Sequence, residues 1–143
     1  MNQIPVHRIG VSAVTIDAQG RGLVIQRRDN GRWEAPGGFL ELAETIEAGA
    51  RREVLEETGL TVELENLTGI YKNMTLGVIN LVFRARAISG ETTTGPETKD
   101  TRWVTRDEVA DLIPIGAFAI RTLDALDNPA TPRIRHHDGL RLQ

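Results

Sequence analysis

The sequence predicts a single α/β domain in which helices cover a mixed β-sheet. Two short apolar segments rich in β-branched residues come before the first helical pattern, and further strand-like segments separate that pattern from two more helices. The chain has 143 residues, enough for one domain with a sizeable core. It shows no internal repeat and no linker. We therefore expect one domain over residues 1–143, with a core at about 8–126 and a C-terminal tail at 127–143.

Composition and charge exclude several classes of protein. The chain contains no cysteine, so it can form neither a disulfide nor a thiolate metal site, and this fits a cytoplasmic protein. No apolar segment approaches the roughly 18 residues of a membrane-spanning helix, and the first residues, MNQIPVHR, lack a signal-peptide core. The net charge of −3 argues against strong nucleic-acid binding through phosphate neutralisation. We expect a soluble cytoplasmic protein without a membrane partner.

The first two strands are expected at residues 8–16, RIGVSAVTI, and 23–27, LVIQR. The polar residues 17–20 between them are a turn signal, which predicts that the two strands form a hairpin.

Three arginines, Arg27, Arg28 and Arg32, lie in the polar loop after the second strand. A guanidinium group can bind phosphate oxygens with two parallel hydrogen bonds, so these side chains are candidate substrate-binding residues. The alternative for each of them is an ordinary surface charge.

The first helix is predicted from about Glu44 to Thr58, and Gly59 ends it because glycine adopts the left-handed conformation without steric cost. Within it Glu53, Glu56 and Glu57 are spaced i, i+3 and i+4, so they share one face. These like charges repel one another, and they lie in the last turn, where the helix dipole already places negative charge. The alternative is a solvated face held by salt bridges. A divalent cation with oxygen ligands is the better explanation of this face.

The second half of the chain is expected to continue the sheet and then to cover it. Strands are predicted at residues 61–65, 76–87 and within 97–104, with a reversal at 66–71. Thr105 and Glu108 form a capping box that begins a helix closed by Pro114. Apolar residues at helical spacing predict a last helix at 115–126.

The region around the first helix resembles the Nudix box. Gly38, Glu44 and the segment REVLEETGL at 52–60 occupy the defining positions of that motif, and the lead-in WEAPGG at 33–38 is also similar to the family. The resemblance covers about residues 8–126. It implies an α/β/α sandwich with the box helix packed on a mixed sheet. It also implies hydrolysis of a nucleoside diphosphate linked to another moiety, with Mg²⁺, or Mn²⁺ in its place, as the cofactor.

The resemblance also assigns roles to individual residues. It implies that Glu56 and Glu57 are the principal metal ligands and that Glu53 is a further ligand or the base that activates water. A carbonyl of Gly37 or Gly38 is expected to complete the metal shell, and Glu97 or Asp100 to add a carboxylate from a loop. Arg52, which we group with the catalytic residues, and Glu44 are expected to orient the acidic turn. Gly59 is expected to end the helix.

The substrate and the oligomeric state are less constrained. Some relatives that prefer ADP-ribose carry a proline after the motif, but this chain has no proline between Leu60 and Gly95. Tyr71 lies too early in the chain for the tyrosine pattern of dinucleoside polyphosphate hydrolases. We therefore expect a nucleoside triphosphate or a small nucleotide conjugate, with those two classes as alternatives. A nucleotide sensor without catalysis is a further alternative, but every glutamate of the motif is present. A homodimer is possible, and His7, His136 and His137 are expected to be ordinary tail residues.

Overall fold

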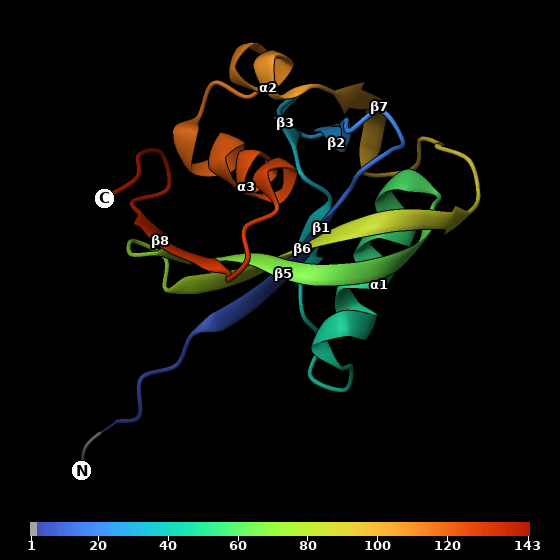
Figure 1. The fold of residues 1–143 in the computed structure, drawn as a ribbon. Helices are drawn as coiled ribbons and strands as arrows, with labels where there is room; N and C mark the ends of the chain where they lie inside the picture. The colour runs from blue at the N-terminus through green and yellow to red at the C-terminus, as the bar shows by residue number, and fades with distance from the viewer. Residues whose placement is uncertain (1–2) are drawn as a thin grey trace.

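The computed structural model describes residues 3–143 (Figure 1). Its strands and helices, in chain order, are β1 (Arg8–Thr15), β2 (Gly22–Arg27), β3 (Trp33–Glu34), β4 (Gly37–Phe39), α1 (Ile46–Thr58), β5 (Thr61–Asn73), β6 (Val78–Ser89), β7 (Thr98–Val104), α2 (Arg106–Leu112), α3 (Gly116–Asp127) and β8 (Arg133–His137). In this part of the chain no helix is both long and apolar enough to cross a membrane.

The strands form two sheets. A five-stranded mixed sheet has the order β4-β1-β6-β5-β8, and a three-stranded sheet has the order β3-β2-β7. The prediction of a hairpin from the first two strands is wrong, because β1 and β2 belong to different sheets and a single bridge between Ile16 and Gly22 links them in the described chain. Both edges of β1 are already paired, with β4 on one side and β6 on the other. The turn signal marked the change of direction but not the strand partner.

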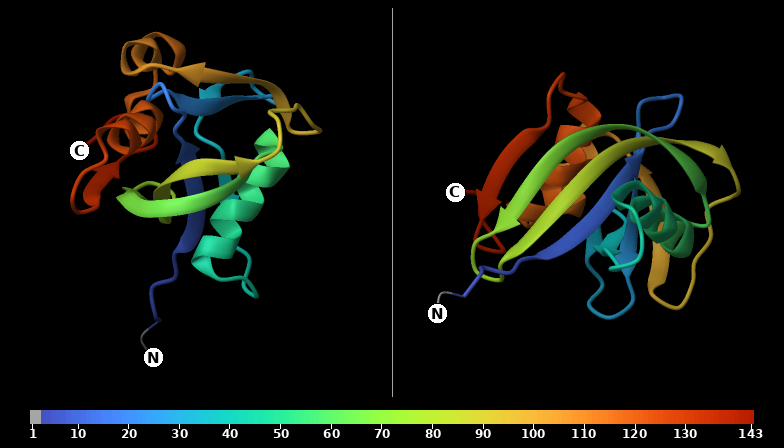
Figure 2. Two further views of the ribbon diagram at one scale, coloured as in Figure 1. Left: turned by 45° about the vertical axis from the view of Figure 1, so that its right-hand side comes forward. Right: turned by 90° about the horizontal axis from the view of Figure 1, so that it is seen from below.

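Helices cover both faces of the mixed sheet, which confirms the α/β/α sandwich (Figure 2). Alternate residues of β1 point to opposite faces, so Ala13 packs with Val54 of α1 while Val14 packs with Ala125 of α3. A third core lies between the smaller sheet and helices α2 and α3. This arrangement holds α1 against β1 and β4, and thereby places the acidic face of the helix beside the glycine-rich strand.

Helix α1 begins two residues later than predicted. Thr45 is the N-cap and its side chain accepts a hydrogen bond from the amide of Ala48, while Glu44 lies outside the helix. The helix ends as expected at Gly59, whose φ of 82° is in the left-handed region. Ala50 and Val54 are fully buried, whereas Ile46, one turn before Ala50, is 39% exposed.

The reversal predicted at residues 66–71 is wrong. Strand β5 is continuous over Thr61–Asn73, and the chain turns after it to enter β6. The pairing of β5 with β6 shifts register between Thr61 and Val62, between Leu64 and Asn66 and between Leu67 and Gly69. These irregularities interrupt the alternation of apolar and polar residues, which explains why the sequence pattern suggested a turn.

The C-terminal tail contributes a strand that the sequence did not indicate. Strand β8 pairs parallel with β5, from Gly69–Arg133 to Asn73–His137. His137 is fully buried and therefore not an ordinary tail residue, whereas His136 is exposed. Burial lowers the pKa of His137, and the positive charge of Arg121 lowers it further, while Asp138 opposes them.

Because the pKa of His137 is lower in the folded state than in the unfolded state, protons bind the unfolded state more readily. We expect the free energy of unfolding to fall as pH drops below about 6.5, the ordinary histidine pKa. Urea denaturation between pH 7.5 and 5.5 tests this. The dependence of the free energy of unfolding on pH should become weaker in His137→Gln and stay unchanged in His136→Gln. The same pH dependence in the wild type and both variants would contradict the prediction.

Candidate active site

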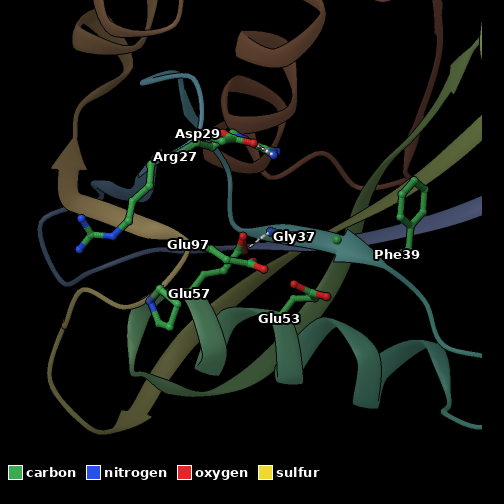
Figure 3. A pocket seen from close by; sticks show the side chains of 10 residues that line it. Arg27, Asp29, Gly37, Phe39, Glu53, Glu57 and Glu97 are labelled. Carbon is green, nitrogen blue, oxygen red and sulfur yellow. Dashed lines mark hydrogen bonds and ion pairs between the residues drawn. The ribbon is translucent and has the colours of Figure 1, made fainter.

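Two glutamates of α1 point toward the strand that carries Gly37 (Figure 3). The amide of Gly37 donates a hydrogen bond of 2.7 Å to Oε2 of Glu57. Glu53 lies one turn earlier, against Gly38, and only about 9% of either glutamate is exposed. A Cβ atom at position 38 would lie 2.5 Å from Oε1 of Glu53, so the absence of a side chain at Gly38 lets the carboxylate approach the backbone.

The electrostatics of this pair favour an added positive charge. Burial raises the pKa of Glu57 to about 8, against the hydrogen bond from Gly37, and the negative charges of Glu53, Glu34 and Glu97 add to the increase. Burial also raises the pKa of Glu53, although Arg52 opposes it. A carboxylate loses favourable hydration when it is buried, so holding both glutamates ionised is costly without a cation beside them. The residues therefore fit a divalent cation.

Arg52 holds the acidic turn together. Its guanidinium donates to both oxygens of Glu44, at 2.6 and 2.9 Å, to Glu53 at 2.8 Å and to Glu56 at 3.3 Å. It also donates to the carbonyl oxygen of Phe39. Hydrogen bonds from Arg52 lower the pKa of Glu44 to about 2. Arg52 thus connects the segment before the helix with the helix face that carries the glutamates.

The three glutamates are not gathered around one point. The side chain of Glu56 is 58% exposed and pairs with Arg52, whereas Glu53 and Glu57 face Gly37 and Gly38. Over residues 3–143 no group of three His, Cys, Asp or Glu side chains is already placed to hold a metal ion. Glu56 would have to leave Arg52 to join its neighbours.

The acidic pair opens into a pocket of about 690 Å³. It is lined by Arg27, Arg28, Asp29, Gly37, Gly38, Phe39, Glu53, Glu57, Pro96 and Glu97. The pocket joins α1 with the loop before β7 and the end of β2. Seven of the residues singled out from the sequence therefore line one cavity, whereas Glu56, Arg52, Arg32 and Asp100 do not.

The three predicted arginines differ in their surroundings. Arg27 is paired with Asp29 at 2.7 Å and with Glu34 at 3.1 Å. Arg28 donates from Nε to the carbonyl oxygen of Gly95 at 2.7 Å. Arg32 lines a neighbouring cavity instead. The ion pair between Arg27 and Glu34 was not apparent from the sequence, because only the pairing of β2 with β3 brings Glu34 close to Arg27.

Comparison with known proteins identifies the fold and motif. The family model described as NUDIX domain matches residues 6–126. The chain belongs to the NUDIX family. It is 49% identical over 138 residues to a MutT-like protein of Streptomyces ambofaciens, an alignment that covers 96% of this chain and 88% of that protein.

Two further similarities concern proteins named for their substrate. An ADP-ribose pyrophosphatase of Methanocaldococcus jannaschii is 35% identical over 62% of this chain and 56% of its own length. The crystal structure of an ADP-ribose pyrophosphatase from Streptococcus suis superposes with a TM-score of 0.76 at 22% identity, covering 92% of this chain and all of that one. The latter similarity shows the shared fold. The protein is thus a Nudix hydrolase of the pyrophosphohydrolase family, whose members generally use divalent cations.

Proposed function

We propose that this Nudix hydrolase cleaves a diphosphate bond in a nucleoside triphosphate or a small nucleotide conjugate by attack of water, with Mg²⁺ as its cofactor and Mn²⁺ as a substitute. The observation that carries the proposal is the pair of buried carboxylates, Glu53 and Glu57, against Gly37 and Gly38 in a pocket that also holds arginines. Few other ligands match this combination as well as a cation bound to phosphate oxygens.

The metal would be held by Glu57 and Glu53, with Glu56 once it leaves Arg52, with a carbonyl of Gly37 or Gly38, and with Glu97 from across the pocket. A divalent cation there supplies neutralisation of phosphate charge and makes a nearby water more acidic. The remaining contributions come from the chain itself. The alternative role of Glu53, in place of metal binding, is that of the base, because its carboxylate faces the pocket and burial makes it a stronger proton acceptor.

The arginines would position the polyphosphate. Arg27 and Arg28 line the same pocket as the carboxylates, opposite α1, so their guanidinium groups can bind phosphate oxygens there. The pairing of Arg27 with Asp29 and Glu34 orients its guanidinium before substrate arrives. Arg52 and Glu44 act through the helix, and their role is to position the acidic turn.

A hydrolysis screen tests the proposal. Purified protein would be incubated with nucleoside triphosphates, oxidised deoxynucleotides, nucleotide sugars, ADP-ribose and dinucleoside polyphosphates, with Mg²⁺, with Mn²⁺ or with EDTA. We expect cleavage that requires the metal and is strongest for one class, read out as released phosphate, diphosphate and nucleotide. No cleavage of any class while calorimetry shows Mg²⁺ bound would overturn the assignment as an enzyme in favour of a nucleotide sensor.

A further inference from the structure

A second cavity adjoins the acidic pocket. Its volume is about 340 Å³, within the usual range for small-molecule sites, and it shares Arg27, Gly37, Gly38 and Phe39 with the first pocket. Its other walls include Glu34 from β3, Asn80 from β6, and Phe118 and Arg121 from α3. A ligand whose phosphates lie beside the carboxylates would therefore place its remaining part in this second cavity.

Arg121 is the unusual residue of the second cavity. Its guanidinium lies 5.2 Å from the ring centroid of Phe118 and 5.7 Å from that of Tyr71. Among the described residues it has neither an ion pair nor a hydrogen bond, and its Nε is buried without a partner. Burial lowers the pKa of Arg121. Arg121 as a whole is half-buried, and Nε is its atom that is buried without an acceptor, which is costly, so this site is short of a hydrogen-bond acceptor.

A second donor nearby also lacks an acceptor. The amide of Gly139 donates to Nδ1 of His137, so the neutral ring carries its hydrogen on Nε2. That Nε2 atom is buried without a partner. His137 is close enough to Arg121 for the arginine charge to lower its pKa. His137 lines neither cavity, however, so the unsatisfied donor group that a ligand in the second cavity can meet is that of Arg121.

The surroundings of Arg121 restrict the shape of that ligand. Because the rings of Phe118 and Tyr71 lie against the guanidinium, its free donors are the nitrogen–hydrogen bonds in its own plane. A planar group with two adjacent acceptors matches this fork. Glu34 lines the same cavity without an ion pair to Arg121, and although its Oε1 accepts a hydrogen bond from Arg27, its carboxylate gives the cavity an acceptor as well as donors.

Guanine has this pattern, whereas adenine does not. Guanine presents O6 and N7 as adjacent acceptors, and its N1 and N2 groups are donors that a carboxylate can accept. Adenine carries an amino group in place of O6. This amino group is a hydrogen-bond donor and would meet the donor groups of the guanidinium without an acceptor between them. We infer that Arg121 is a specificity-determining residue that reads the O6/N7 edge of a guanine-type base, so that guanine nucleotides are preferred to adenine nucleotides. This inference rests on the proposed hydrolysis of nucleotides.

The experiment compares nucleotides that share ribose and phosphates but differ in the base. The kcat/KM would be measured with Mg²⁺ for GTP, ITP, 7-deaza-GTP and ATP, and the Kd values of GMP and AMP by calorimetry in EDTA. We expect GTP and ITP to exceed ATP by about 5- to 150-fold, the effect of one good bidentate contact, and 7-deaza-GTP to lose much of this advantage because it lacks N7. If neither GMP nor AMP binds in EDTA, the ratios of kcat/KM between the four triphosphates test the preference for guanine.

A substitution at position 121 provides the matching test. Glutamine pairs with N6 and N7 of adenine, so Arg121→Gln should reduce or invert the preference for GTP. Arg121→Lys keeps the charge but not the planar fork and should also lose discrimination. Arg141→Gln, at an exposed position outside both cavities, should keep it. Circular dichroism and thermal melting establish whether each variant is folded. If Arg121→Gln does not fold, the comparison of GTP with 7-deaza-GTP in the wild type still tests the inference.

The outcomes separate the two proposals. Equal kcat/KM for GTP and ATP in the wild type would overturn the role of Arg121 while leaving diphosphate hydrolysis intact. Uniform weakening of all four nucleotides in Arg121→Gln would also overturn it, because that result indicates a phosphate contact in place of a base contact. Hydrolysis of no nucleotide, with no preference between GMP and AMP in binding, would contradict both the base reading and the proposed function.

Discussion

Glu57→Gln is expected to lower kcat at saturating Mg²⁺ by about 100-fold or more, while the metal-free protein stays at least as stable as the wild type. The carboxylate of Glu57 is buried beside Glu53 and near Glu97, so removing its negative charge relieves repulsion. A glutamine oxygen can still accept the hydrogen bond from the amide of Gly37. If Glu57 served stability alone, the substitution would lower the stability and leave kcat unchanged.

The measurement combines activity with thermal melting. In the wild type, millimolar Mg²⁺ should raise the Tm, because the ion binds the folded state and neutralises the acidic face, and the increase should be smaller in Glu57→Gln. Glu47→Gln, at an exposed position in the first turn of the same helix, serves as the matched control and should behave like the wild type. Wild-type turnover in Glu57→Gln, or a Tm that does not respond to Mg²⁺ in the wild type, would contradict the proposed metal site.

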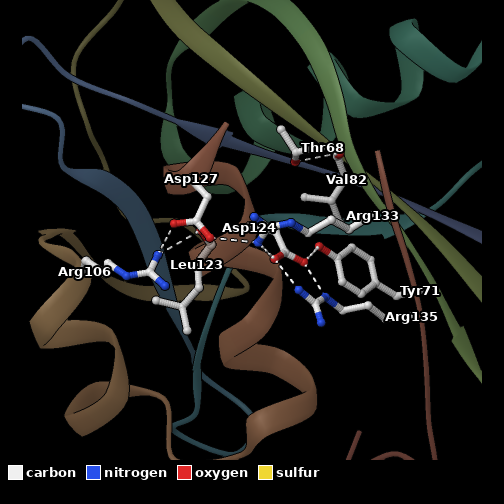
Figure 4. A network of polar contacts seen from close by, with 9 residues as sticks. All are labelled: Thr68, Tyr71, Val82, Arg106, Leu123, Asp124, Asp127, Arg133 and Arg135. Atoms are coloured by element: carbon white, nitrogen blue, oxygen red, sulfur yellow. Dashed lines mark hydrogen bonds and ion pairs between the residues drawn. The ribbon is translucent and has the colours of Figure 1, made fainter. Parts of the chain in front are cut away.

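Asp124→Asn is expected to destabilise the protein by about 3 kcal/mol. Asp124 is fully buried in α3 and accepts hydrogen bonds from Tyr71 at 2.7 Å, from Arg133 at 2.6 Å and from Arg135 at 2.8 and 2.9 Å (Figure 4). Burial alone would raise the pKa of Asp124, but the hydrogen bonds from Arg135, Tyr71 and Arg133 lower it overall. Asparagine keeps one acceptor oxygen but replaces the other with a donor amide group, so part of the hydrogen bonds from Tyr71, Arg133 and Arg135 is lost together with the charge.

Chemical denaturation of the two proteins measures this difference, and a fall in Tm of about 10 °C should accompany it. Asp127→Asn is the matched control, since Asp127 lies three residues later in α3 and also pairs with Arg133, but its side chain is 28% exposed. Its loss should cost about 1 kcal/mol or less. Equal effects of the two substitutions would show that the buried network around Asp124 does not hold β8 and α3 to the sheet. Because the pKa of Asp124 is lowered, its stabilisation should also disappear as pH falls below about 4.

Local sequence patterns were sufficient for the elements that depend on neighbouring residues. The spacing of Glu53 and Glu57 determines that they share a helix face, and Gly59 determines where that helix ends. The Gly37-Gly38 segment and the glutamates of α1 are about twenty residues apart or less, and one motif contains both. Arg27 was placed in the same region by its position near that motif and Glu97 by the family resemblance, and both line its pocket.

Contacts between distant segments were decided by tertiary structure. The sequence contains no signal that β1 pairs with β6 in place of β2, or that β8 pairs with β5, because strand partners depend on which edges remain free after folding.

The amino-acid sequence by itself therefore determined the acidic helix and the glycine-rich segment before it, since both depend on residues close together in the chain, and the resemblance of this motif to the Nudix box indicated the class of reaction. Only the tertiary structure decided the burial that raises the pKa of Glu57 and the placement of Arg121 beside Tyr71 and Phe118. The physical reason is that burial and an unsatisfied charge are properties of packed surroundings. The surroundings of Arg121 are assembled from α3 and β5, and α3 lies far from the motif in the chain.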